Sequence, residues 1–327
     1  MKKYLVPLLF AAALLVSCEK QQESTQPVPK GDAIEFSMSS TAVNTKTSYG
    51  AISGSTQPIN WENGDKFTVY CNEAFLVDSN DKNADYKVTT SSSGNSVSPD
   101  DQNKQLMWGG DGNHTFYAAY PAGHLDGNTF SGNIPTTQNL TGTNGVYAPL
   151  LSDYGYMVAA TTSAKTNNAV SLVFKPIFST IEFTVGPGPS TPVDVKGFRL
   201  ESTTSTLAGR FNATINVGSD PTFSNFSSSA KAISVTFGNT VHIEKNGTIT
   251  FTVIAVPNDM TNLTAYFSVD DKELAIPLKS GDDFITFRKG RKTRINASGA
   301  LGPEAVQAGF TVDITSQGVD EYSISGQ

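Results

Sequence analysis

The chain has 327 residues and a formal net charge of −7, from 23 lysines and arginines against 30 aspartates and glutamates. Such an acidic chain lacks the dense cationic surface that displaces counterions from phosphates, so the charge balance argues against a nucleic-acid-binding protein. Because 38% of the residues are hydrophobic, the chain is not wholly disordered, and its length predicts two domains.

The first residues have the pattern of an export signal. Lys2 and Lys3 precede an apolar stretch, 4–16, that matches a signal peptide's hydrophobic region and is too short to span a bilayer. The stretch ends in Leu15-Val16-Ser17-Cys18, which resembles the lipobox of bacterial lipoproteins. This resemblance implies cleavage before Cys18 and acylation of its sulfur, with lipid such as palmitate as the anchor in the outer membrane. An ordinary signal peptide with a chance cysteine is the alternative.

A polar segment follows the signal. Residues 19–32 contain Gln, Ser, Pro and Lys with almost nothing to bury, which predicts a flexible tether between lipid and folded protein. Once Cys18 is acylated, only Cys71 remains, so an internal disulfide is excluded. Cys71 alternates with Phe67 and Val69, and we expect it to be a small buried side chain rather than a nucleophile.

From residue 33 onward the hydrophobic pattern has a period of two. Alternation of apolar and polar residues predicts half-buried antiparallel strands. Asn-Gly turns, as in 62–65 and 245–248, separate the runs. The predicted fold class is therefore all-β, built from antiparallel β-sandwiches. The alternating sets are Ile34, Phe36 and Met38; Phe67, Val69 and Cys71; Phe116, Ala118 and Tyr120; Ile181, Phe183 and Val185; Phe211, Ala213, Ile215 and Val217; Ile233, Val235 and Phe237; Ile249, Phe251, Val253 and Ala255; Ala265, Phe267 and Val269.

A polar stretch, 161–168, separates two groups of strands and gives the domain boundary. The glycine- and proline-rich run 186–189 is a rival boundary, which we interpret as a loop within the second domain. The predicted organisation is a signal peptide over 1–17, a tether over 18–32, an N-terminal β-sandwich over 33–167 and a C-terminal β-sandwich over 168–327.

Residue types that carry catalysis or bind metals are not grouped in the sequence. His114, His124 and His242 lie in separate segments without a metal-ligand spacing, and the common nucleophile and nucleotide-binding motifs are missing. Residues 78–85 resemble a calcium loop, but Lys82 stands where a ligand is needed, so a surface turn is expected. We therefore predict no catalytic residue, no metal, no cofactor and no enzymatic activity.

Two tryptophans lie next to turn residues: Trp61 between Asn60 and Glu62, and Trp108 before Gly109 and Gly110. An indole in this setting is either a buried anchor at a strand end or a platform for a sugar ring. The second possibility supports an alternative function, a monomeric surface-anchored lipoprotein that binds glycans.

Five stretches, in their order and spacing, resemble the fimbrillin family. This resemblance implies an exported lipoprotein that builds or decorates type V pili, with two transthyretin-like β-sandwich domains and no catalytic site. It implies a stalk or tip subunit that assembles by strand exchange with other fimbrial subunits, self or homologous, and contributes to adhesion to host or bacterial surface ligands. The stretches are Asn44-Thr45-Lys46-Thr47-Ser48-Tyr49, Ile59 to Tyr70 (INWENGDKFTVY), Phe116 to Pro121 (FYAAYP), Phe174 to Val185 (FKPIFSTIEFTV) and Leu207-Ala208-Gly209-Arg210-Phe211.

The resemblance also implies sites of assembly. Fimbrial precursors are cut by an arginine- or lysine-specific protease after the first strand, which places a processing site at Lys46-Thr47 in a polar loop. An uncut chain with a solvated Lys46 is the alternative. The C-terminal tail contains two strand-like pieces for donation to a neighbouring subunit, although the tail has the alternative of folding back as an edge strand. The donor side chains are Phe310, Val312 and Ile314 in the first piece, and Tyr322 and Ile324 in the second.

Overall fold

The computed structural model describes residues 32–38, 48–49, 59–77, 79–92, 94–149, 154–187, 191–260, 262–278, 285–298, 301 and 319–320. Strands dominate these residues, which confirms the predicted all-β class. A 3-10 turn, Gln102–Lys104, begins after Asp101, whose side chain accepts a hydrogen bond from the Asn103 N–H. Within the described ranges, no helix combines the length and the apolar character needed to cross a bilayer.

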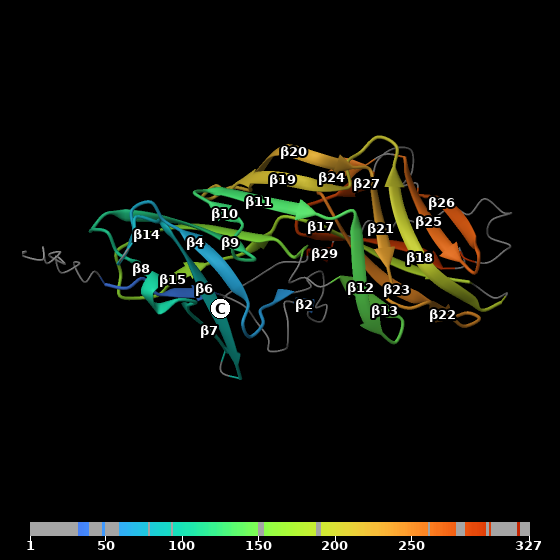
Figure 1. Cartoon of the computed structure of the whole chain (residues 1–327), viewed down its shortest axis with the longest axis horizontal. Helices are drawn as coiled ribbons and strands as arrows, with labels where there is room; N and C mark the ends of the chain where they lie inside the picture. Colours follow the sequence, from blue (N-terminus) through green and yellow to red (C-terminus); the bar gives the residue numbers. More distant parts are fainter. Residues whose placement is uncertain are drawn as a thin grey trace, which may run out of the picture. The chain divides into compact units, whose positions relative to one another are not determined.

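A six-stranded antiparallel sheet contains two of the predicted strands at its centre (Figure 1). Its order is β16-β14-β9-β4-β6-β7. Successive side chains of a strand point to opposite faces, and accordingly Phe67 and Val69 on β4 and Phe116 on β9 are buried together. The strands are β4 (Lys66–Tyr70), β6 (Asn83–Ser91), β7 (Gly94–Pro99), β9 (Asn113–Tyr120), β14 (Met157–Ala164) and β16 (Lys175–Pro176).

An eleven-stranded sheet has the order β26-β25-β18-β21-β12-β13-β23-β17-β28-β29, and β22 pairs with β18 off this path. The pairs β12–β21, β13–β23 and β17–β28 are parallel, so the expectation of antiparallel strands alone is wrong here. Side chains have the same period of two in both kinds of pairing, so alternation does not determine strand direction. The strands are β12 (Thr137–Thr143), β13 (Val146–Pro149), β17 (Ser179–Gly186), β18 (Val193–Ser202), β21 (Ala232–Thr236), β22 (Val241–Ile243), β23 (Ile249–Ala255), β25 (Leu263–Val269), β26 (Lys272–Leu278), β28 (Arg291–Ser298) and β29 (Val319–Asp320).

A four-stranded antiparallel sheet has the order β10-β11-β19-β20. In the β11–β19 pair Gly132 lies opposite Phe211, and a side chain at Gly132 would approach the Phe130 and Phe211 rings to 2.6 Å. Three strands that precede residue 168 pair with strands that follow it: β11 with β19, β12 with β21 and β13 with β23. The predicted domain boundary at that residue stays a prediction. The strands are β10 (Leu125–Asp126), β11 (Thr129–Ile134), β19 (Ala208–Thr214) and β20 (Thr222–Ala230).

Four short pairs complete the described strands. The β1–β15 pair is parallel, and the other three are antiparallel. They are β1 (Phe36–Met38) with β15 (Val170–Leu172), β2 (Ser48–Tyr49) with β3 (Ile59–Asn60), β5 (Phe75–Leu76) with β8 (Leu106–Met107), and β24 (Asn258–Met260) with β27 (Ile285–Phe287).

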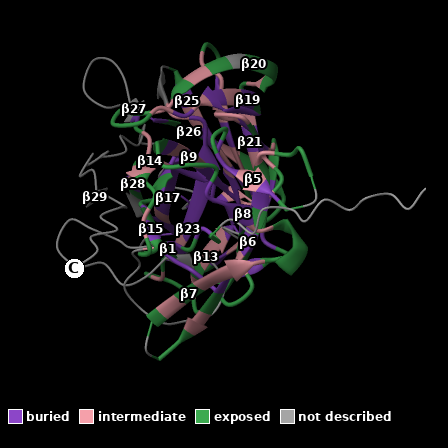
Figure 2. Ribbon diagram, turned by 90° about the vertical axis from the view of Figure 1, so that its left-hand side faces the viewer, coloured by how far each residue is buried: buried purple, intermediate pink, exposed green. Residues whose placement is uncertain are grey.

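Burial follows the predicted alternation in most of the strands. Buried residues concentrate in the inner strands, whereas β7 and β20 carry exposed and half-buried residues (Figure 2). Cys71 is fully buried, as predicted. Val217 was expected in the core but is 45% exposed, because β19 ends at Thr214 and the chain turns through Gly218 at a φ of 74°. Such a positive φ suits glycine and ends the alternation.

Candidate functional site: the groove of the N-terminal segment

Most of the predicted site residues lie outside the described residues. The structure therefore leaves their roles untested. This applies to the lipidation residue Cys18, to Lys46 and Thr47 of the processing site, and to the donor residues Phe310, Val312, Ile314, Tyr322 and Ile324. The strand that processing would release is described, and we call residues 32–38 the N-terminal segment.

The backbone of the N-terminal segment has hydrogen-bond partners on both sides. On one side β1 runs parallel to β15, with Phe36 opposite Val170, and the Val170 N–H donates to the carbonyl of Glu35 at 2.8 Å. On the other side the Ile34 N–H donates to the Leu106 carbonyl at 2.9 Å. The N–H of Trp108 donates to the Asp32 carbonyl at 3.0 Å. The segment therefore fills a groove between β15 and residues 106–108.

The side chains of the N-terminal segment enter the core of the protein. Ile34 is 0% exposed and Phe36 is 5% exposed. The Phe36 ring makes edge-to-face contacts with Tyr86 at 4.8 Å and with Phe116 at 5.5 Å between ring centroids. Met38 was expected to be equally buried, but it is only half-buried. Burial of Ile34 and Phe36 contributes about 3 to 6 kcal/mol, at roughly 1.5 to 3 kcal/mol each.

An ion pair lies at the start of the segment. The Asp32 carboxylate lies 2.8 Å from the Lys165 ammonium, and this hydrogen bond raises the pKa of Lys165. The Asp32 side chain is 70% exposed, so solvent screens the attraction. The apolar contacts of Ile34 and Phe36 therefore hold the segment more firmly than this pair does.

The sequence indicated that the N-terminal segment is a strand, but it did not indicate the partners of that strand. Val170 and Leu172 alternate and mark β15 as a strand, whereas residues 106–108 are a short apolar run without alternation. Both partners are more than sixty positions away in the chain, and no local pattern identifies such a distant neighbour.

The residues of the Trp61 to Asp65 motif hold the local fold together. The Asp65 carboxylate accepts hydrogen bonds from the Glu62 N–H at 2.7 Å and from the Tyr120 hydroxyl at 3.0 Å. Trp61 packs edge-on against Tyr120 and against Phe174, each with 5.0 Å between ring centroids. The motif therefore joins its own turn to β9, a role that the sequence alone did not indicate.

Burial of both tryptophans agrees with buried anchors and not with the alternative of a sugar platform. Trp61 is 1% exposed and Trp108 is 4% exposed. The Trp108 indole contacts the rings of His114 and Phe116 within the core. A buried indole cannot stack on a sugar, so the residues on which the glycan-binding alternative depended do not support it.

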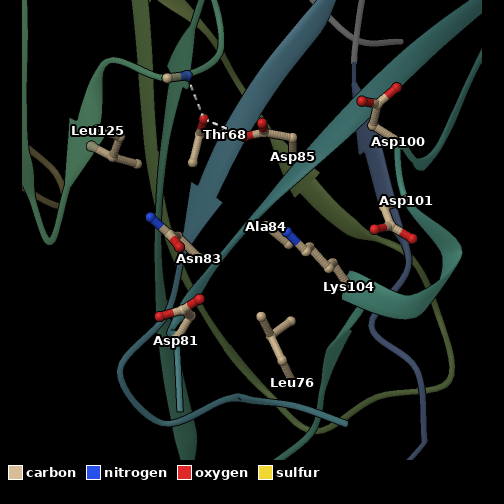
Figure 3. Close-up of a pocket in the computed structure, with 11 residues that line it drawn as sticks. Thr68, Leu76, Asp81, Asn83, Ala84, Asp85, Asp100, Asp101, Lys104 and Leu125 are labelled. Atoms are coloured by element: carbon tan, nitrogen blue, oxygen red, sulfur yellow. Dashed lines mark hydrogen bonds between the residues drawn. The ribbon is translucent and has the colours of Figure 1, made fainter. Parts of the chain in front are cut away.

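An acidic hollow of about 470 Å³ lies beside the run that resembled a calcium loop (Figure 3). Asp85 accepts a hydrogen bond from the Thr68 hydroxyl at 2.6 Å, and Asp100 pairs with Lys66 at 2.8 Å. Asp81 is exposed at the rim. Among the described residues, no group of His, Cys, Asp and Glu has a geometry for holding a metal ion. The expected surface turn over 78–85 is wrong for its last three residues, because Asn83, Ala84 and Asp85 belong to β6.

His114 and Cys71 are two of the buried titratable groups of the described part. The His114 ring accepts a hydrogen bond from the Gly109 N–H at 3.2 Å, and its other nitrogen lies 2.9 Å from the Gly112 carbonyl oxygen. Burial raises the pKa of the Cys71 thiol to about 12, so the reactive thiolate is scarce at neutral pH.

Comparison with known proteins gives one family and a common fold. The model of the fimbrillin-like family matches residues 42–315. A putative cell adhesion protein from Bacteroides uniformis is 15% identical with a TM-score of 0.54, covering 88% of this chain and 97% of its own. A second protein of the same description, from Bacteroides ovatus, is 15% identical with a TM-score of 0.52, covering 88% of this chain and 96% of its own. At this identity the two structures show a shared fold. No curated protein sequence gives a significant match.

Proposed function

The chain belongs to the fimbrillin-like family, and from this premise we propose that it is a stalk or tip subunit of a cell-surface fimbria. In this proposal the subunit has no catalytic role, assembles with other fimbrial subunits by strand exchange and contributes to adhesion. The observation that carries the proposal is the N-terminal segment. It fills an apolar groove, and Lys46 follows it in the chain.

Release of the N-terminal segment would open the groove. Cleavage after Lys46 separates residues 32–38 from the rest of the chain. Without the segment, the Leu106 carbonyl and the Val170 N–H lose their partners, and the Tyr86 and Phe116 rings lose the contact with Phe36. Unpaired backbone groups beside exposed aromatic rings favour the addition of a new strand.

The C-terminal tail is the proposed donor of that strand. Phe310, Val312 and Ile314 have the same two-residue spacing as Ile34 and Phe36. Their side chains therefore fit a groove whose pockets accept alternate residues of a strand. A short part of the same tail, β29, pairs with β28 of its own chain. This pairing agrees with the alternative in which the tail folds back, and donation then requires β29 to leave β28.

Export as a lipoprotein completes the proposal. Acylated Cys18 holds the uncleaved subunit in the outer membrane, and residues 19–32 separate the folded part from the lipid. Cleavage after Lys46 then releases the folded part from this anchor. We expect Cys18→Ala to abolish labelling by a fatty-acid analogue and to leave the protein unanchored. Labelling that persists in the variant contradicts the lipid anchor while leaving strand exchange untouched.

Controlled cleavage tests the assembly mechanism. The purified chain is treated with a lysine-specific protease, cleavage is mapped by mass spectrometry, and polymers are detected by electron microscopy and as a ladder in unheated gels. We expect cleavage after Lys46 followed by polymers, and neither from Lys46→Ala. Lys245→Ala, in an exposed turn, is the matched control and should behave like the wild type. Polymers that retain Cys18 and Thr47 in one uncut chain would refute the mechanism.

A further inference from the structure

Among the described strands, the four-stranded sheet ends in a long edge strand, β20, that has neither proline nor charge. Edge strands expose unpaired N–H and C=O groups, and proteins protect them by shortness, proline, charge or β-bulges. Register shifts against β19 are the protection that β20 has. Among the described strands at the ends of the three larger sheets, β10, β16 and β29 are two residues long, β7 ends at Pro99 and β26 contains Pro277. β20 has nine residues, TFSNFSSSA, with neither proline nor charge.

Strands β11, β19 and β20 lie side by side (Figure 1). A row of aromatic rings crosses them toward this edge. Phe130 on β11 lies 5.9 Å from Phe211 on β19, which lies 5.3 Å from Phe223 on β20. Phe223 stacks on Phe226 with 6.3 Å between centroids and 13° between planes. Phe130 is 0% exposed and Phe211 is 2% exposed, whereas Phe226 is 44% exposed. Within the described residues, the row therefore ends in a partly exposed ring.

A β-bulge places both phenylalanines of β20 on one face. Residues three apart in a regular strand point to opposite faces. Here Ser224 pairs with Asn212 and Ser227 pairs with Arg210, so three steps along β20 correspond to two steps along β19. Asn225 and Phe226 together lie opposite Phe211, and this one extra residue restores the common direction of the Phe223 and Phe226 rings. Lys289 covers the Phe223 ring at 5.7 Å, which leaves Phe226 as the exposed end.

We propose that β20 pairs with β20 of a second copy of this chain, antiparallel across a two-fold axis close to Phe226. A strand that extends the row must bring aromatic rings on one face and a backbone edge without a partner strand, and β20 itself has both among the described strands. In such a self-complementary pair uncharged residues lie opposite uncharged residues, so no like charges meet. β26 fits this edge less well, because it brings Lys272, Glu273 and Pro277.

Sedimentation of the uncleaved full chain tests this contact. The chain carries Cys18→Ala, so that no acyl chain joins copies in detergent micelles. We expect a monomer–dimer equilibrium, a dissociation constant at least about tenfold weaker in Phe226→Lys, and no change in Val146→Lys. Val146, at 60% exposure, is the matched control for an exposed apolar side chain. A wild-type chain that stays monomeric at high micromolar concentration, or a Phe226→Lys variant that dimerises normally, overturns the proposal.

Cross-linking locates the contact independently. Ser227→Cys on β20 and Ser268→Cys on β25 are both exposed, and Cys71 is buried. A short bismaleimide should join two copies of the first variant and not of the second, and equal yields contradict the proposed face. Strand exchange as proposed above requires cleavage after Lys46, so the uncleaved chain reports on β20 alone. Polymers from cleaved Phe226→Lys would support strand exchange, whatever the result for the dimer.

Discussion

Replacement of Phe36 by alanine tests how strongly the N-terminal segment is held in its groove. Phe36 is 5% exposed and contacts the Tyr86 and Phe116 rings, so the substitution removes a buried ring and two edge-to-face pairs. Truncation of a buried phenylalanine typically costs about 3 to 5 kcal/mol of unfolding free energy. We expect a loss in this range for the uncleaved chain, and a loss below about 0.5 kcal/mol for Val146→Ala at an exposed position.

Urea unfolding followed by tryptophan fluorescence measures this loss. Both tryptophans of the chain are buried, and Trp108 contacts Phe116 at 5.8 Å, so their emission reports on the core next to the groove. After cleavage at Lys46 and removal of the released peptide, wild type and Phe36→Ala are the same molecule and should unfold at the same urea concentration. A loss below about 1 kcal/mol in the uncleaved chain would refute the inference that Phe36 anchors the segment.

Three further perturbations probe other parts of the fold. Asp65→Ala removes the acceptor of the Tyr120 hydroxyl and should lower the unfolding free energy by about 2 to 4 kcal/mol in urea titrations, whereas a loss below about 0.5 kcal/mol contradicts this role. A hydrogen bond to Asp194 raises the pKa of His242 above 6.5, so its stabilising effect is full below pH 6.5 and disappears as the pH rises through the raised pKa. His242→Gln should therefore lower the melting temperature more at about pH 5.5 than at about pH 8.5, and an equal effect at both contradicts the assignment. Cys71 should resist a thiol reagent at about pH 8 in the folded chain and react fully in urea, because burial raises the pKa of its thiol to about 12; rapid reaction of the folded chain contradicts its burial.

Several local features of the fold were predictable from the sequence. The alternation in residues 67–71, 116–120 and 249–255 located β4, β9 and β23. The turn at 62–65 was marked by Asn-Gly, and Gly64 has a φ of 95° there, which glycine adopts without steric cost. These features follow from side chains and backbone angles of near neighbours, and the sequence contains that information directly.

The exposure of the tryptophans was not predictable in the same way. Asn60 and Glu62 flank Trp61 in the chain, yet the distant Tyr120 and Phe174 enclose it, and Phe116 packs against Trp108. The residues adjacent to the tryptophans in the sequence therefore did not indicate which residues surround the two indoles in the fold. The sugar platform was an open alternative for this reason.

The sequence by itself determined that this chain is all-β, where many of its strands lie and which of their faces are apolar, because a strand's period of two is a local property. Only the tertiary structure decided the pairing. It placed the N-terminal segment between β15 and residues 106–108, made β17 and β28 parallel, and brought Phe223 and Phe226 to one face through a bulge. Strand direction, partner and register depend on contacts between residues far apart in the chain, and alternation is the same for every such arrangement.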